Sequence, residues 1–272
     1  MIVTTYNQPR FLALVLSALA RQTFQGFDVI VADDGSHPPA EAALAELVGT
    51  LPFRVRHVWH PDQGFRKCSI LNKALRLGVG EYVVFLDGDC ITPCWFLEAH
   101  VRAAQRGRYV TGGKVSLARR LSEVVTLSHV QSGFFDRISW ALLANVDKPR
   151  RVLAARIPLV RTLLNRNVPR PPVWRGENSS TFAEHLFAVG GFDERFTYGC
   201  EDADLGYRLQ AAGVRPVSIR YSAPVFHLYH ERPYANAWEF ERNRQLLLEN
   251  RARGVAFTPY GLPSQRSHSE QQ

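Results

Sequence analysis

Residues 83–90 read VVFLDGDC, and this stretch decides the fold. Four apolar residues lead directly into two carboxylates that are separated by one glycine. A continuous apolar run is typical of a strand buried on both faces, as in a parallel sheet covered by helices. Asp87 and Asp89 therefore stand at the end of a buried strand, where like charges need a cation or hydrogen-bond donors between them. An acidic turn shaped by Gly88 is the alternative.

The residues around this strand alternate between strand and helix patterns. Strand patterns occupy residues 1–6, 27–36, 53–60 and 81–89, and helical spacing of apolar residues occupies 10–23, 40–49 and 67–78. This β-α-β-α-β-α-β order predicts an α/β protein with a mostly parallel sheet covered by helices on both faces. Later segments predict further strands, a helix after residue 200, an amphipathic helix over 237–251 and a frayed tail over 264–272.

Polar clusters follow three of the expected strands, at residues 4–7, 33–36 and 87–89. Ligands of open parallel sheets bind outside the carboxyl ends of the strands, so these clusters are expected to converge on one crevice. No glycine-rich phosphate loop of the common types follows any of the strands. This absence argues against a dinucleotide dehydrogenase and against a P-loop enzyme.

Two further groups of polar residues occur in the second half of the chain. Glu201 and Asp202 precede a helical pattern, so they are expected near a helix N-terminus, where the helix dipole favours ionised carboxylates. Simple capping by Asp202 explains the same pattern equally well. His227 and His230 are three residues apart, and two imidazoles with one carboxylate suit Mn²⁺ better than Mg²⁺. A purely structural histidine pair is the alternative.

Five segments, in the correct order, resemble glycosyltransferase family 2 with a galactosyltransferase-type C-terminal region. They are TTYNQ, VADDGS, GFRKCSILNKAL, FLDGDC and VGGFDERFTYGCEDADLGYRL. The resemblance covers about residues 1–113 and 174–245. It implies the GT-A fold, in which a Rossmann-like, mostly parallel sheet is flanked by helices and a nucleotide-binding half is fused to an acceptor-binding half. It also implies transfer of a sugar from a nucleotide diphosphate, usually UDP, with inversion at the anomeric carbon.

The resemblance divides the chain into parts of one GT-A domain. These parts are a nucleotide-sugar-binding half at 1–113, a basic helical and loop insertion on the rim at 114–173, an acceptor-binding and catalytic half at 174–255, and a flexible tail at 256–272. The insertion matches no motif of the family.

The resemblance also implies which residues bind the donor. They are Thr4, Tyr6, Asp34, Arg66, Asn72, Asp87 and Gly88. Tyr6 is expected beside the base, and Asp34 is expected to accept a hydrogen bond from the uracil N–H. Asn72 belongs to the motif that closes the pocket, and Asp87 is expected near the ribose and the metal.

Metal binding and catalysis are implied by the same motifs. Asp89 and His230 are expected to bind Mn²⁺ (or Mg²⁺), and His227 stands where some relatives have another ligand. Asp202 is expected to be the catalytic base. Glu201 and Tyr198 match acceptor-site positions, and Glu201 is counted with Asp202 among the catalytic residues.

The net charge of +8 is confined to one segment. Eight basic residues and no acidic residue lie between positions 148 and 175, while the other 25 basic residues balance the 25 acidic ones. Such a basic face is expected to bind an anionic acceptor or the surface of an anionic membrane, and a solvated face without a partner stays open. Nucleic acid is not expected as a partner, because the aromatic residues that a single-strand groove needs do not interleave with the charges.

The sequence thus predicts an inverting, metal-dependent glycosyltransferase. The donor is expected to be a UDP-sugar of the galactose or N-acetylhexosamine type, and the acceptor a hydroxyl of a glycan or lipid-linked molecule. No Q-x-x-R-W motif and no membrane-spanning run occur, so non-processive transfer of single sugars is expected. Without a signal peptide, the expected location is the cytoplasm, including the inner face of the membrane. The alternative function is a non-catalytic scaffold that binds nucleotide sugars.

Overall fold

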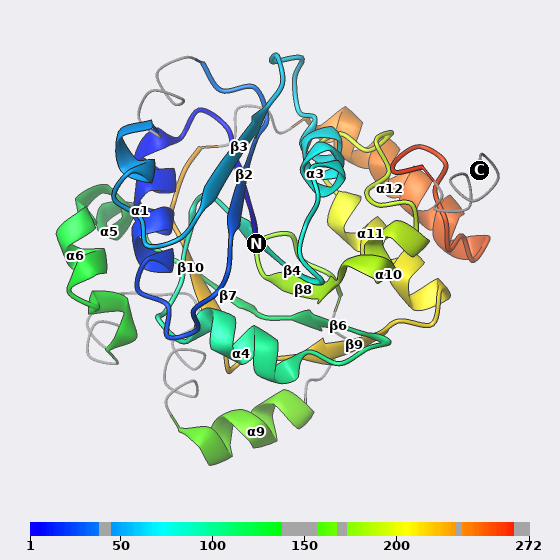
Figure 1. Ribbon diagram of the computed structural model, residues 1–272. Coiled ribbons are helices and arrows are strands. Elements are labelled where there is room, and N and C mark those ends of the chain that lie inside the picture. Colours follow the sequence, from blue (N-terminus) through cyan, green and yellow to red (C-terminus); the bar gives the residue numbers. More distant parts are fainter. Residues whose placement is uncertain (38–44, 138–156, 168–172, 232–235, 264–272) are drawn as a thin grey trace, which may run out of the picture.

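The protein, analysed as a computed structural model, is described over residues 1–37, 45–137, 157–167, 173–231 and 236–263. A seven-stranded sheet with the order β3-β2-β1-β4-β8-β6-β9 forms its centre (Figure 1). The strands are β1 (Ile2–Thr5), β2 (Val29–Asp33), β3 (Val55–Trp59), β4 (Tyr82–Asp87), β6 (Arg108–Thr111), β8 (Ser179–Phe182) and β9 (Arg215–Ser218).

The expected α/β architecture is confirmed, and the sheet is mixed. Strands β3, β2, β1 and β4 are mutually parallel, as the alternating pattern predicts. Strand β8 pairs antiparallel with both β4 and β6, and β9 is parallel to β6. Because β8 comes from the second half of the chain, it joins that half to the N-terminal strands within one sheet.

Helices cover both faces of the sheet (Figure 1). Helices α1 (Pro9–Leu19) and α4 (Phe96–Ala103) pack on one face. The helices α3 (Lys67–Arg76), α10 (Ala183–Ala188), α11 (Glu201–Ala211) and α12 (Ala237–Ala252) contribute side chains to the other face. Residues 40–44 of the helix expected over 40–49 lie outside the described residues.

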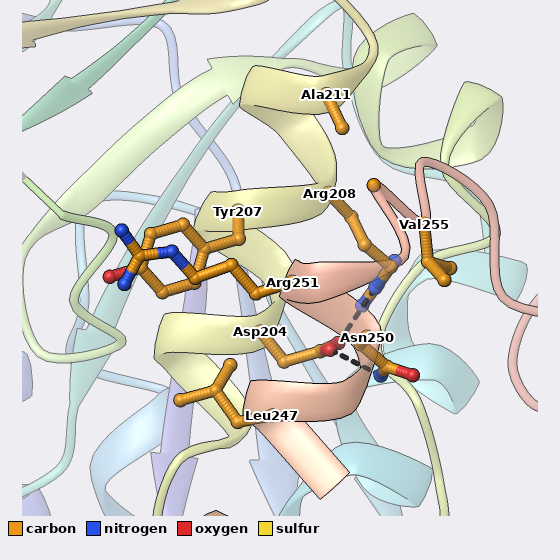
Figure 2. Close-up of a pocket in the computed structure, with 9 residues that line it drawn as sticks. Asp204, Tyr207, Arg208, Ala211, Leu247, Asn250, Arg251 and Val255 are labelled. Atoms are coloured by element: carbon orange, nitrogen blue, oxygen red, sulfur yellow. Dashed lines mark hydrogen bonds and ion pairs between the residues drawn. The ribbon is translucent and has the colours of Figure 1, made fainter.

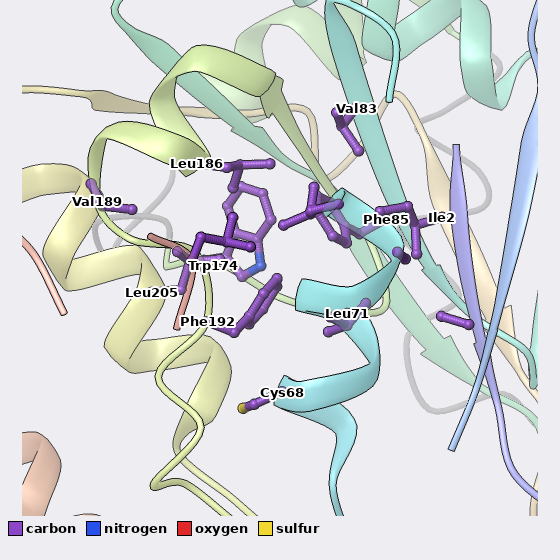
Figure 3. Packing of buried hydrophobic residues seen from close by; sticks show 14 of the residues in the cluster. Ile2, Cys68, Leu71, Val83, Phe85, Trp174, Leu186, Val189, Phe192 and Leu205 are labelled. Carbon is purple, nitrogen blue, oxygen red and sulfur yellow. The ribbon is translucent and has the colours of Figure 1, made fainter. Parts of the chain in front are cut away.

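The continuous apolar run of β4 is explained by this double coverage. Successive side chains of a strand point to opposite faces, so Val83 and Phe85 join the core under α3 and α11, whereas Val84 and Leu86 join the core under α1 and α4. In Figure 3, Phe85 lies near Trp174, and their ring centroids are 5.3 Å apart. Both faces of β4 therefore need apolar residues up to the point where the strand ends.

A second, three-stranded sheet with the order β5-β10-β7 lies beside the first. Its strands are β5 (Cys90–Ile91), β7 (Gly113–Ser116) and β10 (Pro224–His227). Strand β10 pairs antiparallel with β5 and parallel with β7. The segment directly after β4 is thereby tied to a segment near position 227.

The segment expected as a basic helical and loop insertion, 114–173, contains several short helices. It begins within β7 and continues with α5 (Arg119–Val124), α6 (Leu127–Gln131), a short 3₁₀ helix (Phe134–Asp136) and α9 (Pro158–Arg166). Residues 138–156 and 168–172 lie outside the described part of the chain, and so do residues 264–272 of the flexible tail expected at 256–272. Residues 256–263 of that tail pack against the rest of the molecule: Leu262 is buried in the core, and its N–H donates to the Gly190 carbonyl oxygen at 2.7 Å.

Helix α12 differs from the amphipathic helix that its sequence predicts. Its buried residues are Asn243 and Asn250. The Asn243 amide donates to the carbonyl oxygens of Tyr198 and Gly199, both at 3.1 Å. The helix therefore docks through amide groups as well as through apolar contacts, a mode that hydrophobic periodicity does not reveal. None of the helices in the described ranges is both long enough and apolar enough to cross a bilayer.

Candidate functional site

The first part of the site lies where β1 and β4 end side by side. Thr4 and Asp87 are partners in the parallel register, and Thr4 Oγ1 donates to Asp87 Oδ1 at 2.8 Å. The Gly88 N–H donates to the Thr4 carbonyl oxygen at 2.7 Å. A Cβ atom at position 88 would lie only 2.4 Å from that oxygen. Glycine is therefore required for the chain to turn from Asp87 to Asp89 against β1.

Asp89, His227 and His230 form a cluster beside this turn. His227 is held opposite Cys90 in the small sheet, and the Leu228 N–H donates to the Asp89 carbonyl oxygen at 2.9 Å. The Nε2 atoms of His230 and His227 lie 2.8 Å and 3.4 Å from Asp89 Oδ2. One nitrogen or oxygen atom from each residue lies within 4.8 Å of the others. The structure thus brings together the three residues that the sequence assigns to the metal.

The chemistry of this cluster fits a divalent cation. Burial by itself raises the pKa of Asp89, but the hydrogen bond from His230 and the charge of His227 hold this pKa well below its usual range. The carboxylate is therefore ionised, which is the form that binds metal. Two imidazoles with one carboxylate are a donor set for borderline metals such as Mn²⁺.

A second cluster lies on the other side of Asp87 and contains Asp202. Lys67 begins α3, and its Nζ lies 2.8 Å from Asp87 Oδ1. A Cβ atom at Gly176 would lie 2.7 Å from Asp202 Oδ1 and 3.0 Å from Lys67 Nζ. The side chains of Asp202 and Lys67 therefore lie close together, on the side of Gly176 where a Cβ atom would stand. Residues 87 and 202, far apart in the sequence, thus belong to one cluster of charged side chains around Lys67.

The Asp202 carboxyl is in an environment that favours its protonated form. Oδ1 is buried without a hydrogen-bond partner in the described part of the chain. Burial raises the pKa of Asp202 to about 7; Lys67 opposes this rise, whereas Glu201, Asp87 and Glu177 add to it. Burial raises the pKa of Glu201 as well. A carboxyl that exchanges its proton near neutral pH suits acid–base chemistry.

Helix α11 positions Glu201 and Asp202 in its first turn, and buried polar contacts fix the helix. Asp204 Oδ2 accepts from Arg208 Nε at 2.7 Å, and Asp204 Oδ1 accepts from Asn250 of α12 at 2.8 Å (Figure 2). Arg208 Nη1 also donates to the carbonyl oxygens of Val189 and Gly191, both at 2.8 Å. The pocket in Figure 2 is lined by α11, α12 and the residues just after α12. This network holds the acidic first turn of α11 in place.

The residues assigned to the nucleotide base lie in the loops after β1, β2 and β3. Asp34 Oδ2 accepts from the Arg66 N–H at 3.0 Å, and Asp34 Oδ1 lies 2.7 Å from His60 Nε2. Burial raises the pKa of Asp34, and the hydrogen bond with His60 opposes this rise. The Tyr6 hydroxyl donates to Asp62 Oδ2 at 2.9 Å.

The Arg66 side chain donates to Gln63. On the acceptor side, the Tyr198 ring packs edge-on against Phe65, with centroids 5.5 Å apart. Tyr198 thus lies over the residues that lead into α3.

Asn72 differs from the other assigned residues because its side chain is enclosed by protein contacts. It is fully buried, and its amide nitrogen donates to the Phe192 carbonyl oxygen and to Glu194 Oε1. Its amide oxygen accepts from the Phe192 N–H at 2.9 Å. These contacts join α3 to the loop after residue 190, and the assignment of Asn72 to the nucleotide stays a prediction.

Four neighbours of the site were missed by the sequence analysis: Lys67, Gly176, Glu177 and His60. Lys67 lies inside the quoted segment GFRKCSILNKAL, so a cation close to the site could have been predicted from the sequence. Nothing in the sequence indicates that its partner is Asp87. Gly176 matters only through its close approach to Asp202, which no local pattern reveals.

Comparison with known proteins finds a family match over part of the chain. Residues 1–131, just under half of the chain, match the model of glycosyl transferase family 2. Over these residues the chain is similar to this family. The expected galactosyltransferase-type C-terminal region stays a prediction, because the family match ends at residue 131.

Curated relatives of this chain are longer than it is. A chondroitin synthase from Escherichia coli is 27% identical over 254 residues, which are 89% of this chain and 36% of that protein. A validoxylamine A glucosyltransferase from Streptomyces hygroscopicus subsp. jinggangensis is 30% identical over 279 residues, with 96% of this chain and 61% of that protein covered. The chain thus spans less than two thirds of the length of either relative.

A solved structure shares the fold. The mannosyltransferase PcManGT from Pyrobaculum calidifontis, in complex with GDP-Man and Mn²⁺, matches with a TM-score of 0.60 and 20% identity. The match covers 95% of this chain and 64% of that chain. The expected GT-A fold is confirmed.

The raised pKa of Asp202 predicts how its replacement affects stability. Between its unfolded pKa near 4 and its folded pKa of about 7, folding favours the protonated form, so the native state becomes less stable as pH rises through this range. We expect Asp202→Asn to raise the free energy of unfolding at pH 8, on the order of 2–4 kcal/mol, and to have little effect at pH 4.

Thermal unfolding followed from pH 4 to pH 8 measures this difference. Asp193→Asn is the matched control with the opposite sign, because the ion pair with Arg195 lowers the pKa of Asp193 despite its burial. This control variant should be less stable than wild type at pH 8. An Asp202→Asn gain that is the same at both pH values would contradict the environment described for Asp202.

The cluster of Asp89, His227 and His230 predicts Mn²⁺ binding by the protein alone. Mn²⁺ at 100 times its dissociation constant should raise Tm by roughly 5 °C, and Asp89→Ala should abolish the shift. His230→Ala should weaken Mn²⁺ binding measured by titration calorimetry. The control His129→Ala changes an exposed histidine on α6 and should leave affinity unchanged. A full Mn²⁺ shift in Asp89→Ala would rule out this cluster as the metal site.

Proposed function

We propose that this chain is an inverting, metal-dependent, non-processive glycosyltransferase that transfers a single sugar from a UDP-sugar to a hydroxyl of a glycan or glycolipid. One observation carries the proposal. A cation-binding cluster at Asp89 and a carboxyl at Asp202 with a pKa of about 7 flank Asp87 in one crevice. Sugar transfer needs these two kinds of group on opposite sides of the reacting carbon.

The donor side of the crevice holds the leaving group. Asp89, His227 and His230 are the residues that would hold the metal, which when bound supplies positive charge to the leaving diphosphate. Asp87, oriented by Thr4, is assigned to the ribose. Tyr6 and Asp34 are assigned to the base. The diphosphate therefore leaves toward the Asp89 side.

The acceptor side supplies the base. The acceptor hydroxyl attacks C1, its oxygen forms the new C1–O bond, and the bond from C1 to the diphosphate breaks. Asp202 takes the hydroxyl proton, a contribution of about a hundred- to ten-thousandfold in rate for a well-placed base. Because attack comes from the side opposite the leaving group, one displacement inverts C1. Glu201 and Tyr198 are assigned to holding the acceptor.

The proposal also specifies the nucleotide sugar that acts as the donor. The family 2 motifs in the sequence favour UDP, and a sugar of the galactose or N-acetylhexosamine type. The mannosyltransferase that shares the fold was solved with GDP-Man and Mn²⁺, which supports a nucleotide-sugar donor and a divalent metal. Because GDP-Man carries guanine, the choice between uracil and guanine in the donor has to be tested. Mg²⁺ is the alternative cation.

The acceptor class rests on the relatives and on the sequence. One relative is a chondroitin synthase and another is a glucosyltransferase of validoxylamine A, so both polysaccharide and small-molecule glycosylation occur among similar proteins. We favour a glycan or lipid-linked acceptor. Single transfer is favoured over polymerisation because the sequence carries no Q-x-x-R-W motif.

A non-catalytic, nucleotide-sugar-binding scaffold is the alternative function. A scaffold has no need for an ionised Asp89 beside two histidines or for a buried carboxyl at 202. The presence of both groups favours the enzyme.

The test compares wild type with Asp202→Asn and Asp89→Ala, using UDP-hexoses, UDP-N-acetylhexosamines and GDP-Man with and without Mn²⁺. Asp202→Asn should lower turnover by about a hundredfold or more while UDP affinity stays within about twofold, because a base acts in the transition state. Asp89→Ala should lose Mn²⁺-dependent UDP binding. Glu249→Gln, an exposed acid of α12, serves as the control. Wild-type turnover in Asp202→Asn would exclude Asp202 as the base.

We also propose that the basic segment 148–175 contacts an anionic membrane surface, at the cytoplasmic face. Of this segment, residues 157–167 and 173–175 are described. Support comes from α9, whose Leu159 and Leu163 side chains are 72% and 50% exposed. The same helix carries Arg161 and Arg166 and no acid. Exposed apolar residues among basic ones are typical of helices that lie in a membrane interface.

Vesicle binding tests the membrane contact. The protein should bind vesicles that contain phosphatidylglycerol and lose affinity as salt rises, whereas pure phosphatidylcholine should bind weakly. The double change Leu159→Gln and Leu163→Gln should weaken binding about tenfold or more. Val124→Gln, which alters an apolar residue of α5 that is 62% exposed, is the control. If the double variant bound these vesicles as tightly as Val124→Gln does, the proposed role of α9 would be contradicted.

A further inference from the structure

Lys67 is a buried cation that the proposed reaction does not yet use. It is the first residue of α3, and its side chain is 14% exposed. Burial of an ammonium group is costly unless anions surround it. Asp87, Asp202 and Glu201 hold the pKa of Lys67 well above its usual value although burial opposes this. Lys67 is therefore charged and faces carboxylates from two elements, β4 and α11.

The contact with Asp87 fixes one of its two oxygens. Lys67 Nζ and Thr4 Oγ1 both donate to Asp87 Oδ1, each at 2.8 Å. These two bonds orient the carboxylate without using Oδ2. Lys67 therefore acts on the donor side of the crevice through the orientation of Asp87.

The same ammonium group acts on the acceptor side. Asp202 is faced by Lys67 from α3, by Glu201 from α11, by Asp87 from β4 and by Glu177 from the segment before β8. Lys67 is the one cation among these four groups, and three carboxylates in a poorly solvated crevice disfavour a fourth negative charge. Without Lys67, Asp202 would hold its proton to higher pH, so at neutral pH fewer molecules would have the carboxylate free to take the hydroxyl proton.

Gly176 permits this arrangement. The Cβ atom that any other residue places there would lie 2.7 Å from Asp202 Oδ1 and 3.0 Å from Lys67 Nζ. Both atoms are at the ends of side chains, so the two charged groups would move apart. The bare backbone at 176 thus allows the ammonium and the carboxylate to approach each other.

We propose that Lys67 is a positioning residue that couples the donor-side carboxylate Asp87 to the base Asp202. This inference rests on the proposed function for its kinetic consequences, whereas the coupling itself exists in the protein without donor or metal. Lys67 orients Asp87 for the donor and keeps Asp202 able to accept the hydroxyl proton. The two halves of the reaction thereby share one cation.

Kinetics across pH test the coupling. We expect Lys67→Met to lower kcat at pH 7 by about thirtyfold or more and to move the acidic limb of the kcat profile at least about one pH unit upward, so that activity partly recovers at pH 9. Lys67→Arg, which keeps the charge, should keep the limb near its wild-type position. Gly176→Ala, which keeps Lys67, should move the limb upward as Lys67→Met does. A merely structural role would lower kcat at every pH and leave the limb in place.

Lys73→Met is the matched control. Lys73 lies on the same helix, is exposed, and donates to the Trp59 carbonyl oxygen at 2.7 Å. Its replacement should leave the pH profile unchanged. A limb that stays in place in both Lys67→Met and Gly176→Ala would overturn the proposal.

Stability provides a readout that needs no activity. In protein without metal, the Tm gain from Asp202→Asn at pH 8 should be larger in the Lys67→Met background than in wild type, by about 3 °C or more. Equal gains in the two backgrounds would overturn the coupling even if the enzyme is active. Absence of transfer by wild type with every donor would instead count against the proposed function. The Tm comparison, a double-mutant cycle of Lys67→Met and Asp202→Asn, could still be interpreted because it needs no activity. If Lys67→Met does not fold, the same cycle is measured in Gly176→Ala.

Discussion

The contact between the ends of β1 and β4 determines where the charged groups of the crevice lie. The Gly88 N–H bonds to the Thr4 carbonyl oxygen, and a side chain at 88 has no room. This contact turns the chain within two residues, so that Asp87 stays against Thr4 while Asp89 reaches the histidines. Strand β5 begins one residue later and pairs with His227. A register shift between the two strands would therefore move both carboxylates at once.

Two half-buried carboxyls on either side of Asp87 have opposite electrostatic environments. Asp89 faces imidazole groups, which stabilise its charge and lower its pKa. Asp202 faces mainly other acids, and burial raises its pKa. When the pKa values of two acids differ in this way, one site has both a permanent anion and a group that exchanges a proton near neutral pH. Lys67 lies between the two regions, bonded to Asp87. The pKa of each acid thus depends on the partners of its carboxyl group more than on the number of acids nearby.

Much of the fold and part of the site could be predicted from the sequence, for identifiable reasons. The strand at 83–87 was predictable because coverage on both faces forces a continuous apolar run. The grouping of Asp89 with His230 followed from a family resemblance, because no local rule joins positions so far apart. Lys67 could not be paired with Asp87 from sequence, since the contact depends on how α3 packs. The burial of Asn72 against Phe192 could not be predicted either, because it arises from tertiary packing and its motif does not indicate this contact.

The place of β8 has a consequence for how the chain can be divided. This strand comes from residues 179–182 and lies between β4 and β6, antiparallel to both. A fragment that ended at residue 131, where the family match stops, would leave β4 and β6 with unpaired backbone edges at the middle of the sheet. Unpaired strand edges recruit other chains and promote aggregation. We therefore expect the two halves to fold together, because each supplies strands that the central sheet of the other needs.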